Sequence, residues 1–100
     1  LLPKEDAAIY GRFGRMRLKY LKEHRRATYV NLKTSGQLVH YLNEIDREAD
    51  EMLRLLIEQM ARAQGITEQM KATDQLVWAG TMNCIRSAAE EIVLNELICC

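Results

Sequence analysis

The chain has 100 residues, of which 48% are hydrophobic and 28% are charged, and its 14 basic residues balance its 14 acidic ones. This composition suits one folded domain and excludes a disordered chain. No run of 18 apolar residues is present, so we expect no membrane span. The opening Leu1–Leu2–Pro3, followed by Lys4, has no initiator Met and does not resemble a signal peptide, so we expect upstream residues to be missing.

The net charge of zero conceals two oppositely charged halves. Residues 1–36 contain nine basic and three acidic residues, a net charge of +6, whereas residues 37–100 contain five basic and eleven acidic residues, a net charge of −6. We therefore expect one all-helical domain over residues 1–100, in which an acidic body (37–100) carries a basic arm (1–36) for an anionic partner. Alternatively, the two halves neutralise one another within the chain or between chains.

The first expected helix runs from Asp6, an acceptable N-cap, to about Arg25. Gly11 and Gly14 lie inside it and each costs ~1 kcal/mol relative to Ala, so its first turns should bend or fray. Its predicted core face consists of Ile9, Phe13, Met16 and Tyr20. Leu21 and His24 lie beside that face. A separate stripe is wholly positive and consists of Arg12, Arg15, Lys19, Lys22 and Arg26.

Two further helices follow, separated by Gly36. A short one, Ala27–Ser35, ends where Gly36 can take the left-handed conformation. The long one, Gln37–Gln64, contains neither Gly nor Pro, and at ~1.5 Å per residue it exceeds the ~34 Å diameter of a compact globule of this length. We therefore expect an elongated bundle. Its apolar stripe comprises Leu38, Leu42, Ile45, Ala49, Met52, Leu56 and Ala63, and its solvated face comprises Glu44, Asp46, Arg47, Glu48, Asp50, Glu51, Arg54, Glu58 and Arg62.

After Gly65, we expect a fourth helix, Glu68–Thr73, capped by Thr67, and a fifth, capped by Asp74, from Gln75 to about Ile98. Alternatively, these two helices are continuous. The predicted core stripe of the fifth helix is Trp78, Met82, Ile85, Ala89 and Ile92, thickened by Val77, Ala88, Val93 and Leu97. The fold class is thus all-α, with about five helices and no sheet. The long central helix (37–64) should pair antiparallel with the last one and bury Trp78.

No set of residues predicts catalysis, a metal site or a cofactor. The tyrosines are explained by packing on helix faces, and His24 and His40 by positions at the core edge or at caps. Cys84, Cys99 and Cys100 lack metal-ligand spacing and indicate free thiols in a reducing compartment. Asp46 and Asp50 lie one helical turn apart, but neighbouring arginines favour solvent-side ion pairs over a metal. We expect a non-enzyme.

A helix-turn-helix centred on Gly36 has suitable lengths but unsuitable charges. Its recognition helix would begin at Gln37 and soon present Glu44, Asp46 and Glu48 to DNA phosphates, which repel carboxylates. The basic first helix, together with Lys33 of the second, is the better candidate for a DNA contact.

Several blocks resemble the TnpV family of small proteins encoded by bacterial transposons. These blocks are Gly11–Arg12–Phe13–Gly14–Arg15–Met16–Arg17, Tyr20–Leu21–Lys22–Glu23–His24–Arg25, Tyr29–Val30–Asn31–Leu32, Ser35–Gly36–Gln37–Leu38, Glu44–Ile45–Asp46, Gly65–Ile66–Thr67–Glu68 and the close from Ala89 to Ile98. The resemblance implies a cytoplasmic accessory protein of a mobile element, with DNA binding in excision or regulation as the usual suggestion. Family members typically have Pro where this chain has Arg26, and arginines at two places on the last helix where it has Ala79–Gly80–Thr81 and Ala88. The first helix therefore remains the main phosphate-binding candidate.

Two functions are left open by the sequence. In the first, the protein binds DNA phosphates, without catalysis, through Arg12, Arg15, Arg17, Lys19, Lys22, Arg25, Arg26 and Lys33. In the second, it is a protein-interaction or dimerisation module that docks an element-encoded recombinase or a second copy of itself. A homodimer is expected because two long and two short helices enclose a thin core.

Overall fold

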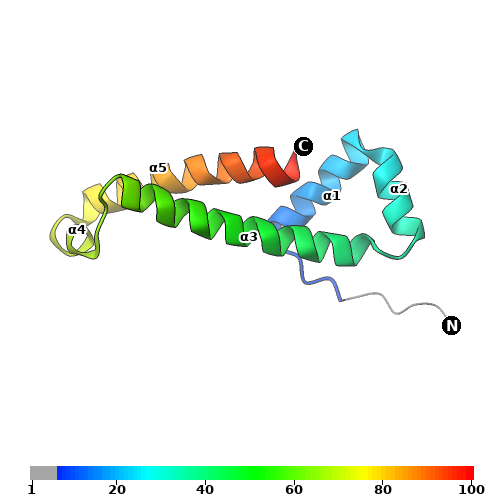
Figure 1. Ribbon diagram of the computed structural model, residues 1–100, viewed down its shortest axis with the longest axis horizontal. Helices are drawn as coiled ribbons and strands as arrows, with labels where there is room; N and C mark the ends of the chain where they lie inside the picture. Colours follow the sequence, from blue (N-terminus) through cyan, green and yellow to red (C-terminus); the bar gives the residue numbers. More distant parts are fainter. Residues whose placement is uncertain (1–6) are drawn as a thin grey trace.

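In a computed structural model of the protein, residues 7–100 are described, and these residues form five α-helices and no strand (Figure 1). The elements are α1 (Arg12–His24), α2 (Arg26–Thr34), α3 (Leu38–Ala63), α4 (Glu68–Thr73) and α5 (Gln75–Val93), which continues into a π-helical turn, η1 (Leu94–Ile98). The prediction of an all-α chain with about five helices is confirmed.

The molecule is elongated, with extents of 60 × 27 × 18 Å. The 26-residue α3 forms its axis, and α5 returns antiparallel along it (Figure 1). The helices α1 and α2 lie at the end where α3 begins, and α4 reverses the chain at the other end. None of the described helices is long and apolar enough to cross a membrane.

Both ends of α3 are joined to their neighbours by the glycine turns that the sequence predicts. Gly36 and Gly65 have φ angles of +73° and +71°, which glycine adopts without steric cost. After Gly36, the amide of Gln37 donates to the carbonyl of Leu32 over 3.0 Å, the bond of a Schellman motif, and the corresponding bond after Gly65 measures 2.9 Å. The helices therefore end where a left-handed residue satisfies their last carbonyls.

The two predicted N-caps of the C-terminal half are also confirmed. The Thr67 hydroxyl accepts a hydrogen bond from the amide of Met70 over 3.3 Å at the start of α4. The Asp74 carboxylate accepts one from the amide of Val77 over 3.5 Å at the start of α5. Each cap satisfies an amide that has no partner inside its own helix.

The first helix begins later than expected. Asp6 lies outside the described residues, and residues 7–11 are not helical. The reason is a tertiary contact with Asn43 of α3. Its side-chain oxygen accepts from the amides of Ile9 and Tyr10, both over 3.0 Å, and its side-chain nitrogen donates to the carbonyl of Ala7 over 2.9 Å. This segment is therefore bound to α3 instead of extending α1.

The buried face of α1 differs from the predicted one. Ile9 and Met16 are 78% and 39% exposed, whereas the buried positions of the helix are Phe13, Gly14, Arg17 and Leu21. Gly14 permits this orientation, because a Cβ there would lie only 2.4 Å from that of Tyr10. Arg15 lies about 200° around the helix from the buried Arg17 and is exposed, so the part of the positive stripe that follows Arg12 points away from the body.

The core is concentrated at one end of the molecule. Its buried apolar residues are Phe13, Leu21, Leu42, Ala49, Ile85, Ala89, Val93 and Ile98. Between residues 50 and 84 no residue is fully buried. On α5, Val93 rather than Ile92 continues the core stripe, since Ile92 is 37% exposed, and Trp78 is only partly buried.

Candidate nucleic-acid interface

Six of the eight predicted DNA-contacting residues are exposed around the corner between α1 and α2. Arg25 is the one residue between these helices, so the chain turns sharply there (Figure 1). We define the basic corner as Arg15, Lys19, Lys22, Arg25, Arg26 and Lys33, all of which are exposed. Within residues 7–100 none of the six takes part in an ion pair. Their charges are therefore available to a partner.

The cations of α1 and α2 are brought together by one aromatic ring. The ammonium nitrogens of Lys22 and Lys33 lie 5.6 Å and 5.8 Å from the ring centroid of Tyr29. Both distances are within the range of a cation–π interaction. The positive stripe of α1 thus continues onto α2, although the two lysines are eleven positions apart in the chain.

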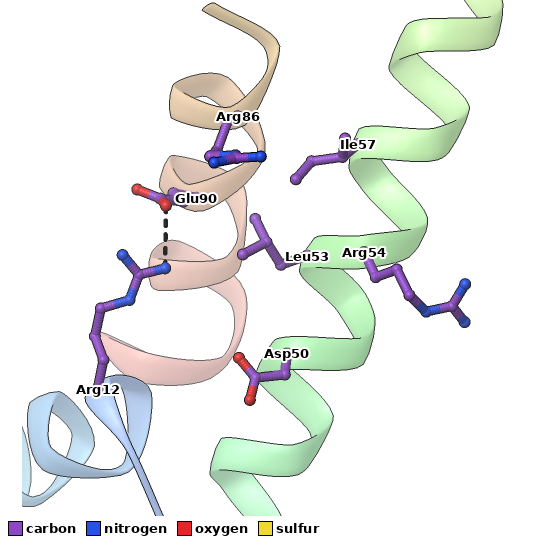
Figure 2. Close-up of a pocket in the computed structure, with 7 residues that line it drawn as sticks. All are labelled: Arg12, Asp50, Leu53, Arg54, Ile57, Arg86 and Glu90. Atoms are coloured by element: carbon purple, nitrogen blue, oxygen red, sulfur yellow. Dashed lines mark hydrogen bonds and ion pairs between the residues drawn. The ribbon is translucent and has the colours of Figure 1, made fainter. Parts of the chain in front are cut away.

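Arg12, the first member of the predicted stripe, pairs with the acidic body. Its guanidinium nitrogen lies 3.0 Å from a carboxylate oxygen of Glu90 on α5 (Figure 2). The guanidinium also lies 4.6 Å from the ring centroid of Phe13. Here the two charged halves neutralise one another within the chain, which was the alternative explanation for their opposite charges. Within the described part of the chain, that explanation holds for Arg12 and does not extend to the basic corner.

Arg17 lies elsewhere, in the core. It is 9% exposed, and one guanidinium nitrogen donates to the carbonyls of Ile98 and Cys100 over 2.9 Å and 3.3 Å, while Nε donates to the Tyr41 hydroxyl over 3.1 Å. Arg17 therefore holds α1, α3 and the end of η1 together and is not accessible to a phosphate. Its spacing of four from both Phe13 and Leu21 was the available signal that it shares their face.

The start of α1 is capped by α3. The carboxylate of Asp46, predicted on the solvated face, is partly buried and accepts a hydrogen bond from the amide of Gly14 over 2.9 Å. A carboxylate at a helix N-terminus also interacts favourably with the helix dipole. Asn43 and Asp46 lie one turn apart on α3, as do Gly11 and Gly14 near the start of α1, and this matched spacing was the only sequence signal for the contact. The basic corner is therefore oriented by two polar residues of the acidic body.

Comparison with known proteins identifies the family. The family model described as transposon-encoded protein TnpV matches residues 1–98. The chain belongs to the TnpV family. No curated protein and no solved structure matches it. In this TnpV-family chain, the Gly11–Arg12–Phe13–Gly14 block forms the contact of α1 with Tyr10, Asp46 and Glu90.

A groove between α3 and α5 carries charges of both signs. It has a volume of about 420 Å³ and is lined by Arg12, Asp50, Leu53, Arg54, Ile57, Arg86 and Glu90. Leu53 and Ile57 point between the two helices, whereas Arg54 points away from α5 (Figure 2). In the described part of the chain no three His, Cys, Asp or Glu residues gather as metal ligands would.

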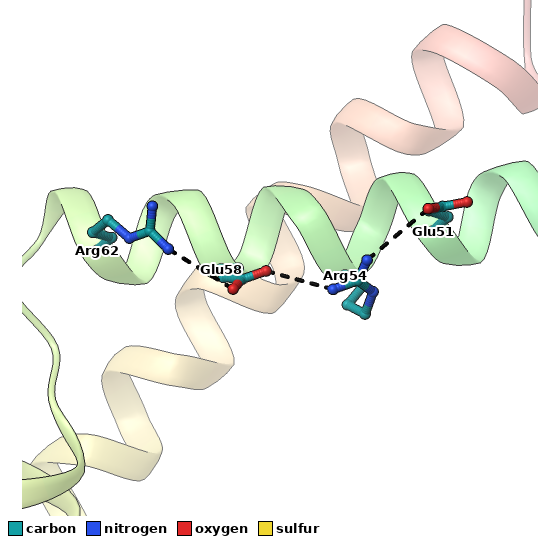
Figure 3. A network of polar contacts seen from close by, with 4 residues as sticks. All are labelled: Glu51, Arg54, Glu58 and Arg62. Carbon is teal, nitrogen blue, oxygen red and sulfur yellow. Dashed lines mark ion pairs between the residues drawn. The ribbon is translucent and has the colours of Figure 1, made fainter.

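The outer face of α3 contrasts with the basic corner. Glu51, Arg54, Glu58 and Arg62 alternate along it, with nitrogen–oxygen distances of 4.0, 3.5 and 3.8 Å between successive pairs (Figure 3). Each positive charge has a carboxylate beside it, so this face presents little net charge. The predicted solvated face is confirmed here.

The remaining candidates for chemistry lie on the surface. His24 is exposed, not at the core edge, and its ring centroid is 4.9 Å from that of Tyr20. Cys84, Cys99 and Cys100 are exposed free thiols, as predicted. None of these groups is combined with a neighbouring base or acid in a buried site that would activate it.

Proposed function

We propose that this TnpV-family chain is a non-catalytic accessory protein of a transposon that binds duplex DNA through the basic corner. The observation that supports this proposal is the set of six exposed cations around the junction of α1 and α2, which form no ion pair within residues 7–100 and two of which, Lys22 and Lys33, lie beside the Tyr29 ring. Exposed charges of one sign are costly to keep close together unless a counterion or a partner neutralises them. The phosphates of a duplex carry a dense negative charge that a cluster of exposed cations can neutralise.

The contact is to the DNA backbone and not to base edges. The basic corner consists of lysines and arginines around the turn between α1 and α2. Phosphate contacts position a protein without specifying sequence. If all six cations neutralise a phosphate, the logarithm of the affinity should fall with the logarithm of salt concentration with a slope of about −5.

A double charge reversal tests the proposal. Arg15→Glu with Lys19→Glu changes the charge by four units on the side of α1 that faces away from the core, so the melting temperature should change little. Affinity for a duplex taken from the transposon ends, measured by fluorescence anisotropy, should fall at least a hundredfold, and equally for a scrambled duplex. Melting curves and far-UV circular dichroism establish whether the variant is folded.

The matched control is Arg54→Glu with Arg62→Glu. It changes the net charge by the same four units on an exposed face of α3 that is outside the basic corner. Affinity should fall only slightly, through the overall charge. Equal losses in the two double variants would show that net charge, rather than the basic corner, attracts the DNA. A folded corner variant that binds DNA as tightly as the original chain would overturn the proposal.

The second candidate function is a protein-interaction module that docks a recombinase of the element or another copy of the chain. The observation that favours it is the absence of fully buried residues from 50 to 84. The two functions differ in their readouts, because DNA binding depends on salt and on the basic corner, whereas a protein contact through apolar residues changes the solution mass.

A further inference from the structure

A pocket lies beside the basic corner, between α1 and the C-terminal end of the chain. It has a volume of about 400 Å³ and is lined by Met16, Lys19, Tyr20, Glu23, His24 and Cys99. Sites that bind small molecules have volumes of ~300–1,000 Å³. Lys19 belongs both to this α1 pocket and to the basic corner, so the two surfaces are continuous.

The wall of the α1 pocket that Cys99 contributes is fixed by the buried Arg17. The Arg17 guanidinium donates to the carbonyls of Ile98 and Cys100, the residues on either side of Cys99. The same guanidinium lies 5.5 Å from the ring centroid of Tyr20, which is within cation–π range. One core residue therefore holds both sides of the α1 pocket in place.

The α1 side of the pocket is a pair of aromatic rings. The ring centroids of Tyr20 and His24 are 4.9 Å apart, and the ring planes are inclined by 39°. Tyr20 is partly buried, whereas the side chain of His24 is 60% exposed. Met16, one turn before Tyr20, is 39% exposed and adds apolar surface. Unpaired bases stack on tyrosine and histidine rings with little regard to sequence, because every base has a π-face.

The charges around the α1 pocket distinguish a place for a base from a place for phosphates. Inside the pocket, Lys19 is balanced by the Glu23 carboxylate, whose side chain is 53% exposed. A carboxylate repels a phosphate, so the pocket itself suits an uncharged flat ring. Outside it, the exposed Arg15 and Lys22 continue from Lys19 along α1 and attract phosphates.

A metal ion fits the α1 pocket less well than a base does. Glu23, His24 and Cys99 all line it. However, within residues 7–100 no three His, Cys, Asp or Glu residues form a group that could hold a metal. The two rings and the apolar surface beside them favour a flat organic ligand instead.

We propose that the α1 pocket binds an unpaired base of a DNA strand whose phosphates contact the basic corner. The protein then prefers a duplex with a single-stranded extension over a blunt duplex, because a paired base must first be taken out of the stack. Stacking does not depend on base edges, so this preference is independent of sequence. The inference rests on the proposed DNA contact and names the form of DNA that the contact favours.

The deciding experiment compares a blunt duplex, the same duplex with a short single-stranded extension, and the same extension made of abasic sites. The two extensions have the same phosphates and differ only in their bases. In fluorescence anisotropy at one salt concentration, the extension with bases should bind about tenfold more tightly than the abasic one. A fluorescent purine analogue in the extension should also be quenched on binding.

Two substitutions connect this difference to the α1 pocket. His24→Ala removes the exposed ring and should abolish most of the tenfold difference, while affinity for the blunt duplex stays the same because His24 is outside the basic corner. Tyr20→Leu removes the other ring and retains an apolar side chain, and it should have the same effect. The matched control is His40→Ala, since His40 is also exposed but does not line the pocket, and this variant should keep the difference. Melting curves establish that each variant is folded.

The outcomes separate this inference from the proposed function. Equal affinities for the two extensions, with salt-dependent binding of the blunt duplex, would overturn the inference alone. Absence of binding to all of the DNAs would overturn the proposed DNA contact as well. A tenfold difference that persists in the folded His24→Ala and Tyr20→Leu variants, or that is lost equally in His40→Ala, would show that the base binds elsewhere and would also contradict the inference.

Discussion

The two halves of α3 have the same sequence pattern and different surroundings. In the first half, Leu42 and Ala49 are fully buried, because α1 and the C-terminal end of the chain pack against the helix there. In the second half no residue is fully buried, because α5 is the helix that packs against α3 there. Apolar periodicity therefore shows which face of a helix turns inward, but burial depends on how many neighbours that face meets.

The largest expected difference between the halves comes from one substitution made in each. Leu42→Ala removes a fully buried side chain and should lower the free energy of unfolding by about 2–5 kcal/mol. Leu55→Ala, on the same helix, should cost under about 1 kcal/mol, because Leu55 is 42% exposed. Urea unfolding of the two single variants measures both losses. Equal losses would show that the two halves do not differ in packing.

The first half of α3 also caps α1, and removing this cap should have an effect of intermediate size. Asp46→Ala removes the acceptor for the Gly14 amide and should cost about 1–2 kcal/mol. Hydrogen exchange should accelerate in α1 and stay unchanged at the start of α5. Asp50→Ala, one turn along the same helix, is the control, and its effect should be close to zero because Asp50 is exposed. A uniform acceleration over the whole chain would contradict a local role for Asp46.

The smallest effect is expected on the solvent face of the second half. Glu58 lies 3.5 Å from one arginine and 3.8 Å from another (Figure 3), but its side chain is 54% exposed. Exposed pairs of this spacing contribute about 0.3–0.5 kcal/mol each, so Glu58→Gln should cost less than about 1 kcal/mol. Thermal melts at low salt and at 1 M salt provide the test, because screening should abolish the difference. A loss that persists at high salt would indicate a packing role.

Apart from the start of α1, helix boundaries and turns were predictable because their causes are local. Gly36 and Gly65, with the caps Thr67 and Asp74, act within four residues of their own position, so the sequence places them correctly. The orientation of α1 was not predictable in this way. Its buried face includes a glycine and an arginine, and Arg17 is buried because its partners are Tyr41 and two carbonyls more than eighty residues away.

In the candidate site, too, the features with local causes were predictable and those that depend on distant residues were not. The exposure of the basic corner follows from the positive stripe of the sequence, since unpaired charges stay in water. The ion pair of Arg12 with Glu90 and the clamp formed by Arg17 depend on α5 and η1 folding back onto α1. The position of α5 beside α1 is set by the length of α3 and by the turn at Gly65. The sequence around Arg12 and Arg17 therefore does not predict which residues contact them.

The helix α2 differs from its neighbours in having no fully buried residue among its nine. It is joined to α1 by Arg25 alone and to α3 by the turn at Gly36, and few apolar contacts fix its tilt. Segments of this kind open at low cost, so we expect faster hydrogen exchange in α2 than in α1. The spacing between the cations of α1 and Lys33 is then adjustable, so under the proposed DNA contact a hinge motion of one short helix would fit the basic corner to a bent or a straight duplex.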